Sequence, residues 1–296
     1  MRFPGIIPAL TTPFGAVDHA ALERNAATLL EAGVHGFVAT GTMGEAGSLS
    51  TQERRDVIAT VVRAAAGRVP VIAGASSGTP EQSIAYARDA AAAGAVAIML
   101  LPPLGYRGDE RETIAHYRAV ADGAGLPVML YNNPEASGTD LPAALVARIA
   151  AEVPQVVAVK ECSGDARRIP AIIAAAPHLE VLVGGDDWAL EGLASGATGW
   201  VSGVADCVPG DCVALYEACL AADLETARGI AQRLLPLSRL DMTPHLVQYF
   251  KAAQDALGLA GGPVRAPRLE LDEAKRAILE EALAALRAPA PAPVAA

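Results

Sequence analysis

Short apolar runs alternate with longer amphipathic segments over most of the chain. The runs are rich in valine, isoleucine and leucine, and turn-forming residues such as glycine, proline and asparagine bound most of them, which favours β-strands. In the segments between the runs, apolar residues recur three and four positions apart, as is typical of helices. The pattern predicts strands at residues 5–10, 36–40, 69–74, 96–101, 127–132, 156–160, 181–184 and 199–203.

The alternation of the two patterns predicts the fold class. Strands that alternate with helices pair in parallel, and eight such units are the number that closes a (β/α)8, or TIM, barrel. We therefore expect a single α/β protein whose barrel occupies residues 1–210. The clearest helical segments between the strands are residues 20–30, 52–66, 81–93, 111–121 and 141–150.

Further helical segments follow the eighth predicted strand. We predict a helical run at 211–235, a helix that Thr243-Pro244 opens as N-cap and first residue, and a helix at 272–287. Together they form an expected C-terminal helical extension, residues 211–287, packed on the barrel. The last residues, 288–296, alternate alanine with proline, have little apolar surface to bury, and are predicted to be a disordered tail.

Composition narrows the class of function. The chain has 296 residues, 52% of them hydrophobic, and a net charge of -10, which disfavours nucleic acid or an anionic membrane surface as a partner. Its four cysteines lack C-x-x-C spacing, its five histidines are scattered, and we expect neither a disulfide framework nor a bound metal. No run is long enough to span a membrane and no signal segment is evident, so a cytoplasmic protein is expected.

One lysine is conspicuous. The chain has only three lysines against twenty arginines, and Lys160 ends the apolar run at 156–160. A lysine amine can lose its proton and attack a carbonyl carbon, which an arginine cannot do. Alternatively, Lys160 simply carries the end of a strand into solvent, and its neighbourhood must decide between the two interpretations.

The ends of the other predicted strands supply a matching set of groups. In a barrel the chemistry takes place at the carboxyl ends of the strands. There the amine of Lys160 and the phenol of Tyr131 suit Schiff-base formation with a 2-oxo acid, with Tyr131 as the acid and base. Burial should lower the pKa of the lysine. The expected substrate-binding positions are the amide-rich turn Gly41, Thr42 and Met43, with Gly184 and Ser202 at two further strand ends.

At these motifs the chain resembles a known family. The ordered set 41–45, 131–134, 159–161 and 184–187 is similar to the dihydrodipicolinate synthase and N-acetylneuraminate lyase family of Schiff-base aldolases, over nearly all of residues 3–285. The resemblance implies that Lys160 forms the Schiff base, that Tyr131 transfers protons and that Thr42 and Met43 hold the substrate carboxylate. It also implies that no cofactor is needed beyond this covalent link, and that the protein is a homotetramer built from two dimers.

The chain departs from the synthase pattern at three positions. Where the synthase has an arginine that binds the carboxylate of its second substrate, this chain has Ala136, which disfavours 4-hydroxy-tetrahydrodipicolinate synthase activity. The second threonine of the glycine-rich turn is replaced by Met43, and Tyr106 is shifted from the place of the usual paired tyrosines. The proton relay of the synthase is therefore expected to be absent or rebuilt.

The segments at 131–134, 184–187, 199–203 and 240–248 resemble the branch that contains 1-pyrroline-4-hydroxy-2-carboxylate deaminases of hydroxyproline catabolism. The expected reaction converts that cyclic imine into 2,5-dioxopentanoate and ammonia and needs no second substrate. A dehydratase or aldolase for 2-oxo-3-deoxy sugar acids is the alternative enzyme. A barrel that binds a 2-oxo acid as a sensor, without catalysis, is the alternative that is not an enzyme.

Overall fold

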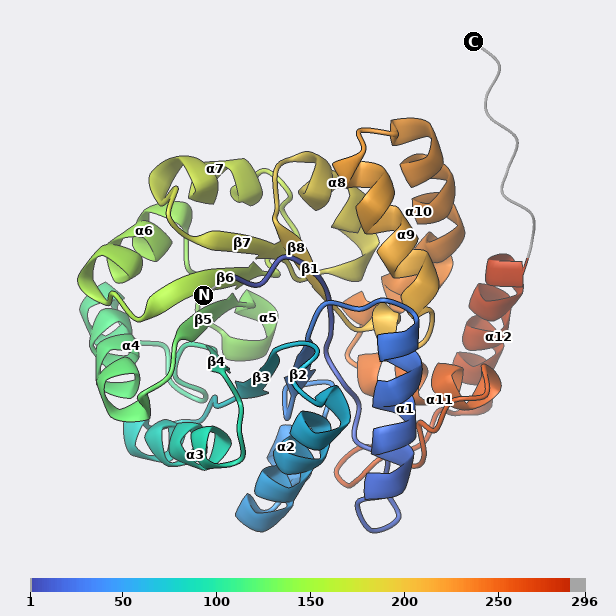
Figure 1. Ribbon diagram of the computed structural model, residues 1–296, viewed down its shortest axis with the longest axis horizontal. Coiled ribbons are helices and arrows are strands. Elements are labelled where there is room, and N and C mark those ends of the chain that lie inside the picture. Colours follow the sequence, from blue (N-terminus) through green and yellow to red (C-terminus); the bar gives the residue numbers. More distant parts are fainter. Residues whose placement is uncertain (1, 288–296) are drawn as a thin grey trace.

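The computed structural model describes residues 2–287, and the predicted tail at 288–296 lies outside them. Eight parallel strands form one sheet that curls into a barrel (Figure 1). All eight predicted runs contain a strand, and the boundaries differ from the prediction by at most two residues. The strands are β1 Gly5–Pro8, β2 Phe37–Ala39, β3 Val71–Gly74, β4 Ala97–Leu100, β5 Val128–Asn132, β6 Val156–Glu161, β7 Glu180–Val183 and β8 Gly199–Ser202.

The strand order confirms the (β/α)8 barrel. From β2 to β8 each strand pairs with the next one along the chain, and β1 pairs with β8. Between β1 and β2 the barrel is closed by a bridge just beyond β1, where Ala9 pairs with Val38 and the amide of Leu10 donates to the Val38 carbonyl over 2.9 Å. This connectivity places all the strand carboxyl ends, and the loops that follow them, at one rim of the barrel.

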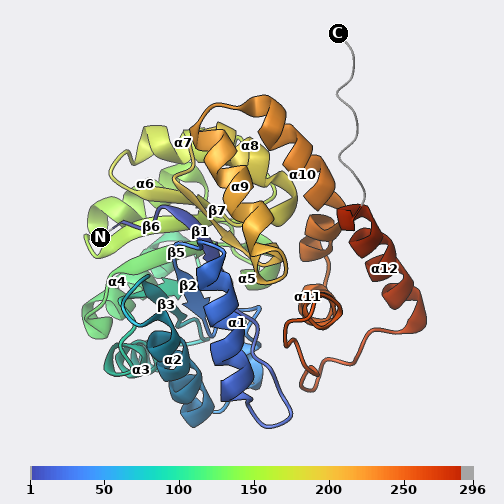
Figure 2. The same ribbon diagram turned by 45° about the vertical axis from the view of Figure 1, so that its right-hand side comes forward.

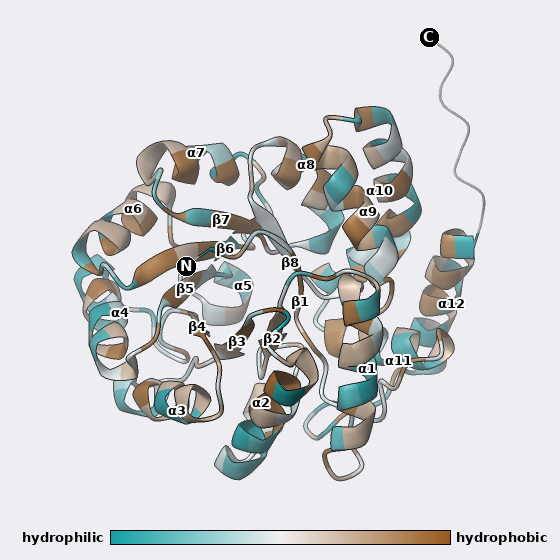
Figure 3. Cartoon of the chain, viewed as in Figure 1, coloured by the Kyte–Doolittle hydropathy of each residue, from teal (hydrophilic) through white to brown (hydrophobic). Residues whose placement is uncertain are grey.

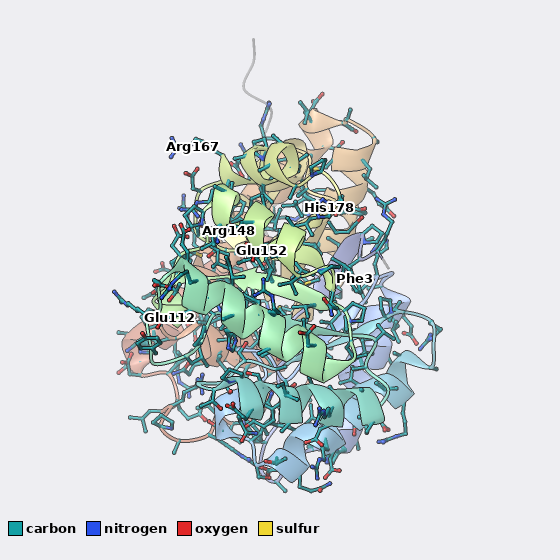
Figure 4. All side chains as sticks on the ribbon, turned by 90° about the vertical axis from the view of Figure 1, so that its left-hand side faces the viewer. Phe3, Glu112, Arg148, Glu152, Arg167 and His178 are labelled. Carbon is teal, nitrogen blue, oxygen red and sulfur yellow. The ribbon has the colours of Figure 1, made fainter. Side chains whose placement is uncertain are left out.

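Helices surround the barrel, and several begin at side-chain caps. Ser50 and Glu53 form a capping box at the start of α2, and Asp109 and Glu112 form another at α4. In Figure 4 the labelled Arg148 and Glu152 lie on the outer surface of α6, where they form an ion pair. The helices of this part are α1 His19–Glu31, α2 Thr51–Ala65, α3 Pro80–Ala92, α4 Glu110–Ala124, α5 Pro134–Ser137, α6 Ala143–Glu152, α7 Arg168–Ala175 and α8 Ala189–Ala194, with the 3-10 turns η1 Ala46–Ser48 and η2 Asp186–Trp188.

The chain beyond β8 is more finely divided than the sequence predicts. The predicted run at 211–235 is two helices, because the chain turns between them at Ala222, which has a φ of 57°. The helix expected to open at Thr243-Pro244 begins only at Leu246, since Thr243 instead ends a 3-10 turn. The elements are η3 Val204–Asp206, α9 Pro209–Leu220, α10 Leu224–Ser238, η4 Arg239–Met242, α11 Leu246–Ala256 and α12 Glu273–Arg287.

The hydropathy of the residues shows where the core lies. Figure 3 shows apolar residues along the strands and polar residues on the outward faces of the helices. Ile6, Ile72, Ile98 and Val159 are fully buried within the single core. Figure 2 shows α10, α11 and α12 gathered on the side of the barrel where α9 lies. Among residues 2–287, no helix is long and apolar enough to cross a membrane.

Candidate active site

A cavity of about 200 Å³ opens at the carboxyl ends of the strands and contains the two predicted catalytic side chains. Lys160 and Tyr131 are direct neighbours in the register of β6 and β5, and the Lys160 amine lies 4.4 Å from the centre of the Tyr131 ring. Both side chains are buried to more than nine-tenths. Of the predicted substrate-binding residues, the cavity wall contains Gly41, Thr42, Met43 and Gly184.

The turn after β2 lines this cavity and contains amide groups without a protein acceptor. Thr40 and Glu45, which flank the turn, both have left-handed backbone conformations, with φ of 53° and 52°. Such conformations cost energy in residues other than glycine and persist where the surroundings enforce them. Within the described chain, the amides of Thr42 and Met43 donate to no protein acceptor. They are therefore available to hold a carboxylate, as the sequence predicts.

A buried ion pair holds this turn in place. Glu45 accepts a bond from the Lys251 amine at 3.0 Å and another from the Arg265 amide at 3.0 Å. The Lys251 amine also donates to the carbonyls of Thr12 and Pro263. All three hydrogens of this ammonium group are thus used, so Lys251 stabilises the scaffold, whereas Lys160 forms no hydrogen bond within residues 2–287.

The pKa of Lys160 contradicts one expectation. Burial acts to lower it, as the sequence argument predicts. The acidic groups around the amine, however, favour its charged form, and they include Tyr131, Cys162, Asp241 and Asp186. These groups outweigh burial and raise the pKa of Lys160 above its ordinary value. The amine therefore carries a proton at neutral pH and must pass it on before it can attack a substrate.

Tyr131 is a protonated phenol in this site. Burial raises the pKa of its hydroxyl, and the nearby lysine only partly offsets the effect. The side-chain amide of Asn133 donates to the phenol oxygen over 3.0 Å. Because Asn133 supplies the donor, the phenol hydrogen is left for a group in the cavity. Asn133 also lines the cavity, and the sequence analysis assigned it no role.

Gly184 and Ser202, both predicted to bind substrate, lie at different places relative to the cavity. A Cβ on Gly184 would lie 2.7 Å from the Glu161 carbonyl and 2.9 Å from Cε of Lys160, so only glycine leaves room for the lysine side chain. Ser202 is fully buried and donates to Asp186 at 2.9 Å, and it is not part of the cavity wall. Its predicted contact with substrate has no geometric support, while its neighbour Gly203 does line the cavity.

Asp241 is a cavity residue to which the sequence analysis gave no role. It belongs to η4, far along the chain from the barrel strands, and it lies in the same cavity wall as Lys160. Burial raises the pKa of its carboxyl to about 6, against the opposing effect of the lysine charge. The only signal in the sequence was the segment 240–248, which carried the resemblance to the deaminase branch.

The charges of the cavity wall are unequal. Among the described residues of the wall, Lys160 is the only cationic side chain, while Glu135 and Asp241 contribute two carboxyl groups. Ala136 occupies the wall at the position where the synthase pattern has an arginine. In the described part of the chain, no group of three or more histidine, cysteine, aspartate or glutamate residues is arranged to hold a metal ion.

Known proteins match the chain over almost its whole length. The model of the dihydrodipicolinate synthetase family matches residues 2–286. Proteins named 4-hydroxy-tetrahydrodipicolinate synthase from Hyphomonas neptunium and Methanoculleus marisnigri are 39% and 38% identical, and each alignment covers 95% of this chain and 98% of the relative.

Solved structures give the same result. A dihydrodipicolinate synthase from Acinetobacter baumannii, described as complexed with pyruvate, is 31% identical with a TM-score of 0.91, covering 97% of this chain and 99% of that one. Another similar structure, 26% identical with a TM-score of 0.92 over 96% of this chain and 97% of that one, is described as a monomeric variant of the same enzyme. Members of this family are lyases that bind a small substrate through a lysine Schiff base without an external cofactor. This chain belongs to the dihydrodipicolinate synthase family.

Proposed function

We propose that the protein is a Schiff-base deaminase that converts 1-pyrroline-4-hydroxy-2-carboxylate into 2,5-dioxopentanoate and ammonia. The observation that carries the proposal is the charge of the cavity wall, in which Lys160 is the single cation and Glu135 and Asp241 are carboxyls. The substrate has one carboxylate, for the amides of Thr42 and Met43, and one ring nitrogen that becomes a cationic amine during the reaction. Two carboxyl groups stabilise such a cation.

The reaction begins at the ring carbon that bears the carboxylate. The Lys160 amine attacks this carbon of the C=N bond, the bond from the carbon to the ring nitrogen breaks, and the ring opens to leave a free amine and a Schiff base on the lysine. Tyr131 then moves the proton from the adjacent carbon, and the 4-hydroxyl departs as water with a proton from the site. Lys160 and Tyr131 are placed for these steps by their pairing in β6 and β5.

Two hydrolysis steps complete the reaction and release its products. After tautomerisation, one water hydrolyses the imine at carbon five and releases ammonia. A second water hydrolyses the Schiff base on Lys160 and leaves the 2-oxo group of the product. One water leaves and two enter, so substrate plus one water gives 2,5-dioxopentanoate plus ammonia, and no second organic substrate is used.

The synthase reaction of the named relatives is the second candidate, favoured by 38–39% identity to them. It joins pyruvate to a second substrate that has its own carboxylate. A guanidinium group binds a carboxylate with two parallel hydrogen bonds, and the methyl group of Ala136 offers none. Among the described residues, no arginine lines this cavity. An adjoining cavity that also contains Thr42 and Tyr131 has Arg54 and Arg268 in its wall, but Arg54 donates to two backbone carbonyls and Arg268 pairs with Glu45. A 2-oxo-3-deoxy sugar acid would use the same lysine, but it has no cationic group to meet Glu135 and Asp241.

Substrate turnover tests the proposal. Purified protein is given 1-pyrroline-4-hydroxy-2-carboxylate, pyruvate with aspartate semialdehyde, or a 2-oxo-3-deoxy sugar acid, with Lys160→Ala as the control. We expect ammonia release from the first substrate alone and none from the variant. Condensation of pyruvate with the semialdehyde, without ammonia release from the pyrroline, would contradict the proposal and assign the synthase reaction instead.

We also propose that the protein is a cytoplasmic homotetramer, on the strength of the family resemblance. Static light scattering over a dilution series measures the mass directly. A mass four times that of the 30.2 kDa chain is expected. A mass equal to one chain at all concentrations would place this protein with the monomeric variant.

A further inference from the structure

Two carboxyl groups, Asp186 of η2 and Asp241 of η4, act electrostatically on Lys160, and they differ in their hydrogen bonds. Asp186 accepts four: from the Trp200 indole and the Ser202 hydroxyl at 2.9 Å each, and from the amides of Gly203 and Val204 at 3.1 and 2.7 Å. Both of its oxygens are therefore occupied, and the group anchors the turns after β7 and β8.

Asp241 has only one such bond. Its Oδ2 accepts from the Asp186 amide at 3.3 Å. Its Oδ1 has no hydrogen bond to the described residues, and the side chain forms part of the cavity wall. Asp241 therefore has an oxygen free to exchange a proton inside the cavity, which Asp186 does not have.

The groups that face Asp241 come from several elements. Lys160 is the cation among them, and its charge opposes the effect of burial on the aspartate. The ionisable groups of α11 point elsewhere, since Lys251 is held by Glu45 and Asp255 accepts from the amides of Gly261 and Gly262. On α10, Arg233 pairs with Asp211 and Arg228 lines a separate cavity. The remaining ionisable neighbours are Tyr131 from β5, Cys162 after β6, and Asp186 and Asp187 from η2. Arg239 of η4 acts on Asp187 and not on Asp241.

We propose that Asp241 is the base that accepts the proton of Lys160 before the lysine attacks its substrate. In this step the N–H bond of the ammonium group breaks, an O–H bond forms on the aspartate, and a free amine faces a neutral carboxylic acid. Lys160 and Asp241 form no ion pair within 4.0 Å in the described chain, so a water molecule in the cavity carries the proton between them. The acid then returns the proton to the nitrogen or oxygen that leaves the substrate.

This inference rests on the Schiff-base step of the proposed function but not on the identity of the substrate. Pyruvate therefore serves as the probe. The protein is mixed with pyruvate for varied times between about pH 5 and about pH 9 and quenched into excess sodium borohydride, and the reduced adduct on Lys160 is measured by mass spectrometry. The readout is the rate of Schiff-base formation as a function of pH.

The parent and the variant Asp241→Asn should give differently shaped profiles. In the parent the rate should rise through a limb near pH 6, where Asp241 loses its proton, and then level off. In Asp241→Asn the limb should vanish, and the rate should climb steadily toward alkaline pH, as the lysine must now lose its proton to solvent. Removal of the carboxyl also lowers the pKa of Lys160. Loss of the base should outweigh this effect, so we expect a fall of about 100-fold at neutral pH. Asp241→Glu, which restores a titrating carboxyl, should restore the limb.

Asp187→Asn is the matched control, because Asp187 is the adjacent carboxyl of η2 but lines a different cavity. It should keep the limb and the rate at neutral pH, with the limb moved to slightly lower pH because Asp187 raises the pKa of Asp241. An Asp241→Asn protein that retains the limb, or whose rate falls equally at every pH, would overturn the proposal and leave a structural role only. A Glu variant without the limb would overturn it as well. Absence of any adduct in the parent would refute the Schiff-base chemistry itself.

Discussion

At the scale of single residues, the three lysines show how position decides chemistry. Lys160 is a buried amine without a hydrogen bond in the described chain, Lys251 is a buried amine with three, and Lys275 pairs with Asp272 on α12. The sequence singled out the first by its place at a strand end. It could not predict the direction of its pKa shift, because the acidic groups responsible include Asp186 and Asp241, which reach the site only through the fold.

Replacement of Lys251 should therefore affect stability rather than chemistry. Lys251→Met leaves the Glu45 carboxylate buried without its ammonium partner, and we expect a loss of about 3–5 kcal/mol in the free energy of unfolding. Lys275→Met removes only a surface pair and should cost less than about 1 kcal/mol. Urea denaturation of both variants measures the two values. Equal effects would show that the ion pair does not hold the turn after β2.

At the scale of elements, the hydrophobic pattern predicts the strands well because each strand is a run of buried residues, as in β4 and β5. It predicts less about the segment after β8, where short 3-10 turns such as η4 have no periodic signal. Asp241 lies in that turn, which is why the pattern could not place it in the site. Gly184 was predicted to touch substrate, and what the structure shows is that it makes room for Lys160.

The close packing around Gly184, just after β7, predicts that one added methyl group lowers kcat strongly. In Gly184→Ala the new Cβ would meet Cε of Lys160 at 2.9 Å and the Glu161 carbonyl at 2.7 Å, so the amine must shift. We expect a fall in kcat of about 100-fold, since displacements of about 1 Å have that effect. Gly229→Ala in α10 meets nothing within 4 Å and should leave kcat unchanged. Steady-state kinetics of both variants gives the comparison, and equal kcat values would refute the steric argument.

At the scale of the whole molecule, eight strand ends meet at one rim and gather residues that are far apart in sequence. The fold class could be predicted from the repeated strand and helix pattern alone. The same pattern could not predict which buried polar groups this packing leaves without hydrogen-bond partners. His116 on α4 is one of them, since neither of its ring nitrogens has a hydrogen bond among residues 2–287.

His116 should make the molecule sensitive to acid. Burial lowers the pKa of its imidazole to about 4 from its ordinary value of 6.5. Below pH 6.5 the imidazole of His116 is protonated in the unfolded chain but stays neutral in the folded chain. The free energy of unfolding therefore falls as the pH falls toward 4. At about pH 5 the cost is roughly 2 kcal/mol. Urea denaturation at about pH 7.5 and about pH 5 measures this loss of stability. The loss should disappear in His116→Phe and should persist in His178→Phe, since His178 is exposed. Identical pH dependence in all three proteins would contradict this assignment.

In the proposed reaction, Lys160 binds the cyclic imine covalently before ammonia is released. The direct measurement is borohydride reduction during turnover of 1-pyrroline-4-hydroxy-2-carboxylate, followed by mass spectrometry of the peptides. We predict an adduct with the five-carbon skeleton of the substrate on Lys160, and none in Lys160→Ala. Ammonia release without an adduct, or an adduct on Lys251 or Lys275 alone, would contradict the proposed role of Lys160.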